Sequence, residues 1–278
     1  MPSTSESPAG TFHAFEHAGW HQRAKGYRQH FQQLVTQTVA PLLDAAGAGP
    51  EVELLDVACG PGFVTAAAAE RGARATGLDF SAPMLEMARR DWPALQFMAG
   101  DAANMPFAEG SFDAVTIAFG MLHFAEPERV LREAHRVLRP GGVLAFTVWD
   151  APGERNAVFR IIVDTLAAHA QPVDVPAGPP FFQFADPQVC RSALSAAGFA
   201  PSSVVTTVLP LSWDLPAPGG LIEAFLEGTA RTGAVIAAQP PSRREAIRAA
   251  LEQACAPYRA GDRLHVPAAA ALTSARRT

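Results

Sequence analysis

The sequence predicts an α/β fold in which helices cover both faces of a doubly wound, mostly parallel sheet of seven strands. Between residues 52 and 149, short apolar runs alternate with stretches of helical periodicity. Glycine or proline separates most of these segments, and both residues interrupt regular structure. Such strand–helix alternation gives parallel strands joined by crossover helices. Further helical segments precede the alternation and separate its last two strands.

The first fifty residues are expected to precede the sheet. Residues 1–11, rich in Ser, Pro and Glu, are predicted to be disordered. Residues 12–50 are predicted to form a helical lid that breaks around Gly19 and Gly26 and ends at Gly47.

One face of this segment has a spacing that resembles a metal site. His13, Glu16, His17 and His21 recur at helical intervals. So close to the terminus, a solvent-exposed polar face is the favoured interpretation, and no metal site is predicted.

Residues 51–150 are expected to hold the ligand-binding core. Ser81 is a candidate cap for the second of its helices, and Pro83 suits the first turn. Strands are expected at residues 52–57, 75–79, 95–99, 112–119 and 143–149. Helices are expected at residues 65–71, 83–90 and 126–138.

The second half is expected to complete a single domain over residues 12–278. Residues 151–219 contain the remaining α/β elements: helices at 154–170 and 187–198, the second opened by Asp186-Pro187, and a strand at 204–213. Residues 220–260 are predicted to be a helical cap, with helices at 220–238 and 242–258. The second of these begins with Ser242-Arg-Arg-Glu245, a capping box. Residues 261–278 are expected to hold the last strand.

The composition argues against several classes of partner. Apolar residues make up 49% of the 278 residues, charged residues 18%, and the net charge is −5. Without a basic stripe, nucleic acid is not an expected partner. No apolar run approaches the roughly 20 residues of a membrane-spanning helix. Cys59, Cys190 and Cys255 form no CxxC pair, which fits a reducing cytoplasm. A monomer or homodimer is expected.

The most informative segment is residues 54–63, where an apolar strand leads through Asp56 into a glycine turn and then a helix. Gly60 and Gly62 let the backbone approach a ligand where a Cβ atom would clash. Asp79 ends the next strand, where a carboxylate can accept both hydroxyls of a ribose. Ligands of such sheets bind at the carboxyl ends of the strands, so we expect a nucleoside there.

A nicotinamide or flavin dinucleotide would use similar geometry, but the turn argues against one. The G-x-G-x-x-G pattern counted from Gly60 would need glycine at Thr65. Pro61 removes an N–H that a pyrophosphate would use. Asp56 repels phosphate and favours a cationic ligand. A nicotinamide-dependent oxidoreductase therefore remains the less favoured alternative.

The chain resembles the class I S-adenosylmethionine (SAM)-dependent methyltransferases, which have a Rossmann-like fold. Thr116-Ile-Ala-Phe-Gly120 is similar to the small-molecule subgroup that makes ubiquinone and menaquinone, whereas Leu122-His123 replaces the Arg-Asn typical of those enzymes. The resemblance occurs, in order, at Asp56-Val-Ala-Cys-Gly-Pro-Gly62, Gly77-Leu-Asp-Phe-Ser81 with Met84-Leu85, Gly100-Asp-Ala102, Ser111-Phe-Asp113 and Leu131 to Gly142.

The resemblance implies SAM as cofactor and assigns roles to individual residues. Asp79 would hold the ribose, and Asp56 would lie near the methionine ammonium. Asp101 would accept the adenine amino hydrogen beside the Ala102 amide, although an Asp that caps its own loop is the alternative. Ala58 stands where the family usually has glycine. Further cofactor contacts are implied for Ala58, Gly60, Gly62, Phe80, Met84, Ala118 and Phe119.

The acceptor side is less defined. Tyr27 is a candidate lid residue over the cofactor, the alternative being simple packing on the sheet. His123 follows the fourth strand and is the candidate general base, with a surface or supporting histidine as the alternative. Four aromatic residues are candidates for an apolar acceptor wall or, equally, for core packing: Phe181, Phe182, Phe184 and Phe225.

The implied activity is methyl transfer to a small-molecule acceptor on oxygen, carbon or nitrogen by in-line displacement. A SAM-fold enzyme that catalyses a different reaction, such as cyclisation, is an alternative, as is a regulatory binding module without activity.

Overall fold

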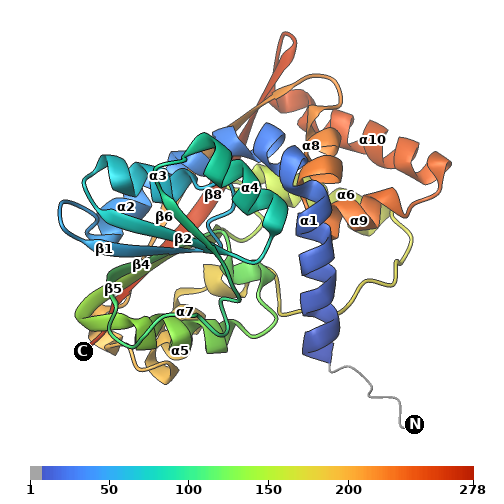
Figure 1. Cartoon of the computed structure of the whole chain (residues 1–278). Coiled ribbons are helices and arrows are strands. Elements are labelled where there is room, and N and C mark those ends of the chain that lie inside the picture. The colour runs from blue at the N-terminus through green and yellow to red at the C-terminus, as the bar shows by residue number, and fades with distance from the viewer. Residues whose placement is uncertain (1–7) are drawn as a thin grey trace.

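The computed structural model describes residues 8–278, which are built around one mixed sheet (Figure 1). Strands β3, β2, β1, β4 and β5 run parallel to one another, and β8 is antiparallel to both of its neighbours on the main path, β5 and β6. The two-residue strand β7 (Arg259–Ala260) pairs with β8 off this path. The predicted doubly wound, mostly parallel sheet is confirmed, with β7 as an addition. The order is β3 (Gln96–Ala99), β2 (Arg74–Asp79), β1 (Glu53–Val57), β4 (Phe112–Ala118), β5 (Leu138–Trp149), β8 (Arg263–Arg276) and β6 (Val205–Pro216).

Helices lie on both faces of the sheet. Figure 1 shows α2 and α3 on one side and α5 and α7 on the other. Asp186 caps α7 as expected, because its carboxylate accepts a hydrogen bond from the Gln188 N–H at 2.7 Å. Ser81 occupies the N-cap position of α4, but its side chain makes no capping bond. The bounds are α2 (Val39–Ala46), α3 (Phe63–Glu70), α4 (Ala82–Asp91), α5 (Pro127–Val137), α6 (Ala157–His169) and α7 (Pro187–Ala196).

The N-terminal helix α1 (Pro8–Val35) corrects two expectations. Residues 8–11 are helical rather than disordered, since proline fits the first turn of a helix; residues 1–7 lie outside the described residues. The helix also continues through Gly19 and Gly26, where breaks were expected. Both glycines lie where α1 touches the cap: a Cβ atom on Gly26 would lie 2.2 Å from the Glu227 carbonyl oxygen. They therefore allow close packing rather than a turn.

The cap between β6 and β8 contains α8 (Gly220–Gly228), α9 (Arg231–Ala237) and α10 (Pro241–Cys255). A single helix over residues 220–238 was therefore a wrong expectation. Gly228 ends α8, and Thr229 after it is extended. A Cβ atom on Gly228 would lie 2.8 Å from the Phe31 ring, so α8 packs closely on α1 at this point.

The capping box at Ser242 is also wrong. Helix α10 begins one residue earlier, at Pro241, and no side chain caps it.

The lid helix and the cap share one hydrophobic core. Phe31 of α1 packs against Trp213 of β6 and Phe225 of α8, with ring centroids 4.6 and 5.9 Å apart. Trp213 and Phe225 are almost fully buried. Since burying a large apolar side chain contributes roughly 1.5–3 kcal/mol, this cluster fixes the position of α1 over the sheet.

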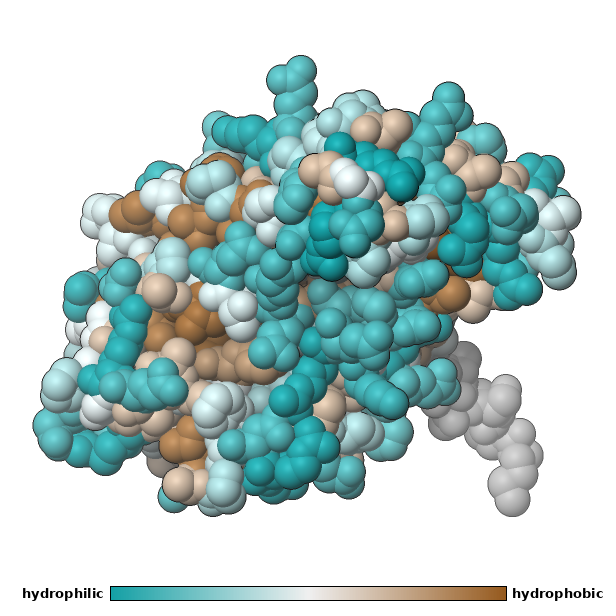
Figure 2. Space-filling view, turned by 90° about the horizontal axis from the view of Figure 1, so that it is seen from above, coloured by the Kyte–Doolittle hydropathy of each residue, from teal (hydrophilic) through white to brown (hydrophobic). Residues whose placement is uncertain are grey.

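The outer surface shows no large apolar face from the side drawn in Figure 2, where hydrophilic residues surround smaller apolar patches. Within residues 8–278, none of the helices has the length and apolar character needed to cross a membrane.

Candidate cofactor and acceptor site

The site lies where the strand order of the sheet reverses, between β1 and β4. These neighbouring parallel strands lead to helices on opposite faces, which leaves a crevice at their carboxyl ends. The chain leaves both strands in a left-handed conformation, with φ of 55° at Ala58 and 54° at Phe119. This conformation is strained for residues other than glycine, and such strain concentrates at functional sites.

The glycine turn after β1 opens toward the crevice. Gly60 has φ of 53°, and the nearest atom to a Cβ placed there would be the Met84 sulfur at 4.0 Å. Gly62 has φ of 85°, but a Cβ there would lie 2.8 Å from the Phe97 ring. Gly60 therefore faces the space for a ligand, whereas Gly62 starts α3 against Phe97.

Asp79 connects the end of β2 to this turn. One carboxylate oxygen accepts a hydrogen bond from the Gly60 N–H and the other from the Ser81 N–H, both at 2.8 Å. The side chain is 7% exposed, and burial raises its pKa. The carboxylate keeps acceptor capacity that a ribose hydroxyl can use.

Asp56 is held more completely by the protein. Its carboxylate accepts bonds from the Thr65 N–H at 3.0 Å, the Thr65 hydroxyl at 2.7 Å and the Thr116 hydroxyl at 3.2 Å. Burial raises the pKa of Asp56 to about 7, against the opposing effect of these bonds. Asp56 thus joins β1, α3 and β4 beneath the turn.

Three adjoining cavities bring the predicted residues together. The main cavity shares Phe80 and His123 with a second one, and shares Tyr27, Ala58, Gly60 and Ala118 with a third. Gly62 lies in none of these three walls. The predicted residues of the main cavity are Tyr27, Ala58, Gly60, Asp79, Phe80, Met84, Ala118, Phe119 and His123. Asp101 and Ala102 line the second cavity, and Asp56 lines the third.

Asp101 caps its own loop, as the alternative interpretation expected. Its carboxylate accepts a bond from the Ala103 N–H at 2.8 Å. Because Asp101 is exposed and also lines the second cavity beside Phe80, its other oxygen remains accessible to a ligand.

The lid side of the main cavity comes from α1. The Tyr27 ring stacks on Phe31 and meets Trp20 edge-on, with centroids 5.6 and 5.4 Å apart. Burial raises the pKa of the Tyr27 hydroxyl, and the negative charges of Asp79 and Asp56 raise it further. Tyr27 thus faces the cavity near both carboxylates, as a lid residue would.

His123 has a partner that was not expected from the sequence. Its Nδ1 atom lies 2.9 Å from Oε2 of Glu16, which also accepts a bond from Trp20 Nε1 at 3.0 Å. Glu16 is only 2% exposed, so its assignment to a solvent-exposed face was wrong. His13 and His17 do remain exposed. The signal that was overlooked is a buried stripe with period four, in which the carboxylate stands between apolar residues: Phe12, Glu16, Trp20 and Ala24.

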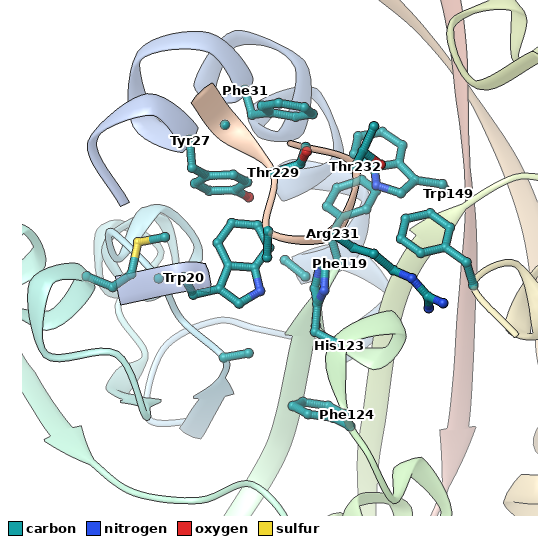
Figure 3. Close-up of a pocket in the computed structure, with 18 of the residues that line it drawn as sticks. Trp20, Tyr27, Phe31, Phe119, His123, Phe124, Trp149, Thr229, Arg231 and Thr232 are labelled. Carbon is teal, nitrogen blue, oxygen red and sulfur yellow. The ribbon is translucent and has the colours of Figure 1, made fainter. Parts of the chain in front are cut away.

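Only two of the four candidate phenylalanines line the acceptor side of the main cavity. Phe181 and Phe225 line the main cavity, whereas Phe184 is buried against Phe146 and Phe182 packs on Phe159. Figure 3 shows Trp20 and Tyr27 on one side of this cavity and Trp149 on the other, with His123 below. Wall residues that sequence reasoning missed are Trp149, Phe159, Thr229, Arg231 and Thr232. Gly228 was the available signal for Thr229, Arg231 and Thr232, because a glycine inside an expected helix can mark a break after it.

The groups that line the crevice fit SAM. The open turn at Gly60 accepts a backbone approach, Asp79 offers free lone pairs, and Phe80 and Met84 form an apolar wall beside them.

Comparison with known proteins agrees with this arrangement. Residues 55–146 match the family model described as a methyltransferase domain. A demethylmenaquinone methyltransferase of Renibacterium salmoninarum is 44% identical over 111 residues, which are 40% of this chain and 47% of that protein. Residues 55–146 are therefore similar to a methyltransferase domain. The chain spans about half the length of the curated relatives it matches.

Solved structures extend the likeness beyond the methyltransferase domain. The YcgJ protein of Bacillus subtilis superposes with a TM-score of 0.57 at 20% identity, over 87% of this chain and 98% of that one. The [4+2]-cyclase SpnF does so with a TM-score of 0.50 at 21% identity, over 87% of this chain and 80% of that one. At these identities the likeness concerns the fold.

Proposed function

We propose that the protein transfers a methyl group from SAM to a small-molecule acceptor. The observation that carries this proposal is the pair of hydrogen bonds that fixes the Asp79 carboxylate between the Gly60 turn and Ser81, at the reversal point of the sheet. When bound, SAM supplies an electrophilic methyl group on a positively charged sulfur. A relative named as a methyltransferase adds support.

The charge of the crevice favours a cation over a pyrophosphate. Asp56 lines the third cavity, and no basic residue of the described chain contributes to that wall. Asp79 adds a second carboxylate in the adjoining main cavity, whose one arginine, among the described residues, belongs to the cap at Arg231. In a site of low dielectric, these groups attract an ammonium or a sulfonium and repel phosphate. The nicotinamide alternative is therefore disfavoured by charge as well as by Pro61.

We propose that His123 takes the proton of the acceptor. The Glu16 carboxylate can only accept hydrogen bonds, so the His123 Nδ1 atom carries the hydrogen of their 2.9 Å contact. The Nε2 atom of a neutral ring is then the free base, and His123 lines the main cavity. An acceptor O–H at this nitrogen would pass its proton to His123 as its oxygen attacks the methyl group.

The remaining walls would hold the acceptor and exclude water. Aromatic residues of α1, β5, α6 and α8 surround the main cavity, which limits water around the reacting groups. A cytoplasmic location and an assembly of one or two copies stay predictions.

The test combines binding with the fate of the label. Calorimetry with SAM, S-adenosylhomocysteine and NADH is expected to show binding of the first two only. Protein incubated with methyl-labelled SAM and a panel of phenols, quinols, amines and carboxylates is then expected to move the label to one acceptor class. Tight NADH binding without SAM binding would exclude the proposal. Consumption of a substrate while the label stays on SAM would indicate a non-methyl reaction.

A further inference from the structure

Arg231 places a cation in a cavity whose walls are otherwise largely aromatic. It is the first residue of α9, directly after the break between α8 and α9, and it is half-buried. Figure 3 shows its side chain crossing the cavity, with the guanidinium on the side where Trp149 lies. Among residues 8–278, no other Arg or Lys lines this cavity.

The Arg231 guanidinium has no polar partner among residues 8–278. Within the described residues, Arg231 makes no side-chain hydrogen bond and no ion pair, whereas cap and neighbouring arginines are engaged: Arg248 lies 3.7 Å from Glu223 and Arg263 3.1 Å from Asp214. A half-buried guanidinium loses part of its hydration, and a carboxylate compensates for this loss best because its two oxygens accept two hydrogen bonds from the guanidinium. The unused donors of Arg231 therefore point to an anionic ligand group.

The cavity walls suit a flat molecule. The Phe159 ring has centroid distances of 5.0, 5.9 and 5.7 Å to Trp149, Phe181 and Phe225. Phe119 stacks on Trp149 at 4.0 Å with an interplanar angle of 26°. Aromatic surfaces of this kind stabilise a bound ring through stacked and edge-on contacts.

We propose that the acceptor is a planar aromatic acid whose carboxylate pairs with Arg231 and whose hydroxyl is presented to His123. This inference rests on the proposed function, because it names the acceptor of the same site. The two polar anchors differ in kind: Arg231 binds an ionised group, and His123 receives a proton. Their common cavity has Asp79 in its cofactor wall, so the carboxylate of the acceptor is attracted to the cap and repelled from the cofactor side.

The test uses two probes with the same ring system: 6-hydroxy-2-naphthoate, which has a carboxylate, and 6-hydroxy-2-naphthamide, which has a neutral amide in its place. Their dissociation constants are measured by naphthol fluorescence with the full chain saturated with S-adenosylhomocysteine. The variants are Arg231→Gln and Arg231→Lys. Arg191→Gln is the matched control, because Arg191 lies on α7 outside the cavity and its replacement changes the net charge equally. Saturation is verified first, so a failure of cofactor binding is seen as a failure of the proposed function.

We expect the unmodified protein to bind the naphthoate about 10- to 100-fold more tightly than the naphthamide, the scale of a charged hydrogen bond. Arg231→Gln is expected to remove this preference while leaving naphthamide binding unchanged. Arg231→Lys is expected to keep part of it, and Arg191→Gln all of it. Equal binding of both probes by the unmodified protein, binding of neither, or a preference that survives Arg231→Gln in cofactor-loaded protein would each overturn the inference.

Discussion

Oε2 of Glu16 lies 2.9 Å from Nδ1 of His123, although 107 positions separate them in the chain. The histidine follows β4, and the carboxylate comes from the N-terminal helix. The ring is therefore oriented only when α1 is docked over the crevice. If His123 is the general base, as proposed, the docking of α1 also orients the base.

Replacing Glu16 with Gln is expected to lower kcat while leaving the Kd for SAM within about twofold, because orienting partners act through the residue they hold. His123→Ala is expected to lower kcat about 10²- to 10⁴-fold, the usual contribution of a general base. Steady-state kinetics and calorimetry measure the two quantities separately.

His21→Gln is the matched control on α1, since His21 is exposed and lines none of the three cavities, and it is expected to leave kcat unchanged. Parallel losses of kcat and of SAM affinity in Glu16→Gln would instead indicate that Glu16 only supports the packing of α1.

Asp79→Ala is expected to weaken SAM binding by about 1–3 kcal/mol, the cost of losing a charged hydrogen bond. The carboxylate holds Gly60 and Ser81 and has lone pairs left for the ribose. Calorimetry provides the dissociation constants. Asp164→Ala, an exposed substitution on α6, serves as the control. An unchanged Kd for Asp79→Ala would remove the ribose role.

Asp56 predicts how stability without cofactor depends on pH. Its pKa is about 7 in the folded chain against the ordinary 3.8 of an aspartate, because burial disfavours the charged form. The folded state therefore holds a proton that the unfolded chain releases above about pH 4. The contribution of this group to the free energy of unfolding is complete below that pH and is lost as the pH rises to about 7.

Denaturant titrations between pH 4 and 8 measure this slope, and Asp56→Asn is expected to flatten it. A bound cation opposes the effect by favouring the carboxylate, so the increase in melting temperature caused by SAM is expected to grow toward pH 7. An equal slope in the unmodified protein and in Asp56→Asn would mean that other groups cause the pH dependence of stability.

Gly26→Ala is expected to destabilise the protein by about 1–3 kcal/mol, as overpacking of a well-packed contact does. The added methyl group would lie 2.2 Å from the Glu227 carbonyl oxygen, which is backbone and cannot rotate away. Gly49→Ala is the control, since nothing lies within 4 Å of a Cβ there. Thermal unfolding compares the two, and equal melting temperatures would mean that α1 does not need this close approach.

Local patterns were sufficient for the sheet and for the meeting of the Gly60 turn with Asp79. Asp79 and Gly60 follow short apolar strands, and the rule that parallel strands end at one edge brings them together without further information. Glu16 and Arg231 were missed because their roles depend on contacts between distant segments. Gly26 also depends on a distant contact. Local patterns predict a helix break there, whereas α1 continues and the glycine allows close packing against Glu227.

The glycine contacts between α1 and the cap also affect how this fold can be redesigned. Gly19 packs on Ala230 and Gly26 on Glu227, so the surfaces of α1 and the cap are complementary in shape. A chimera that imports only a foreign 220–260 segment would set new side chains against an unmatched helix. Under the proposed function, we expect a change of acceptor preference to require that both pieces be transplanted together.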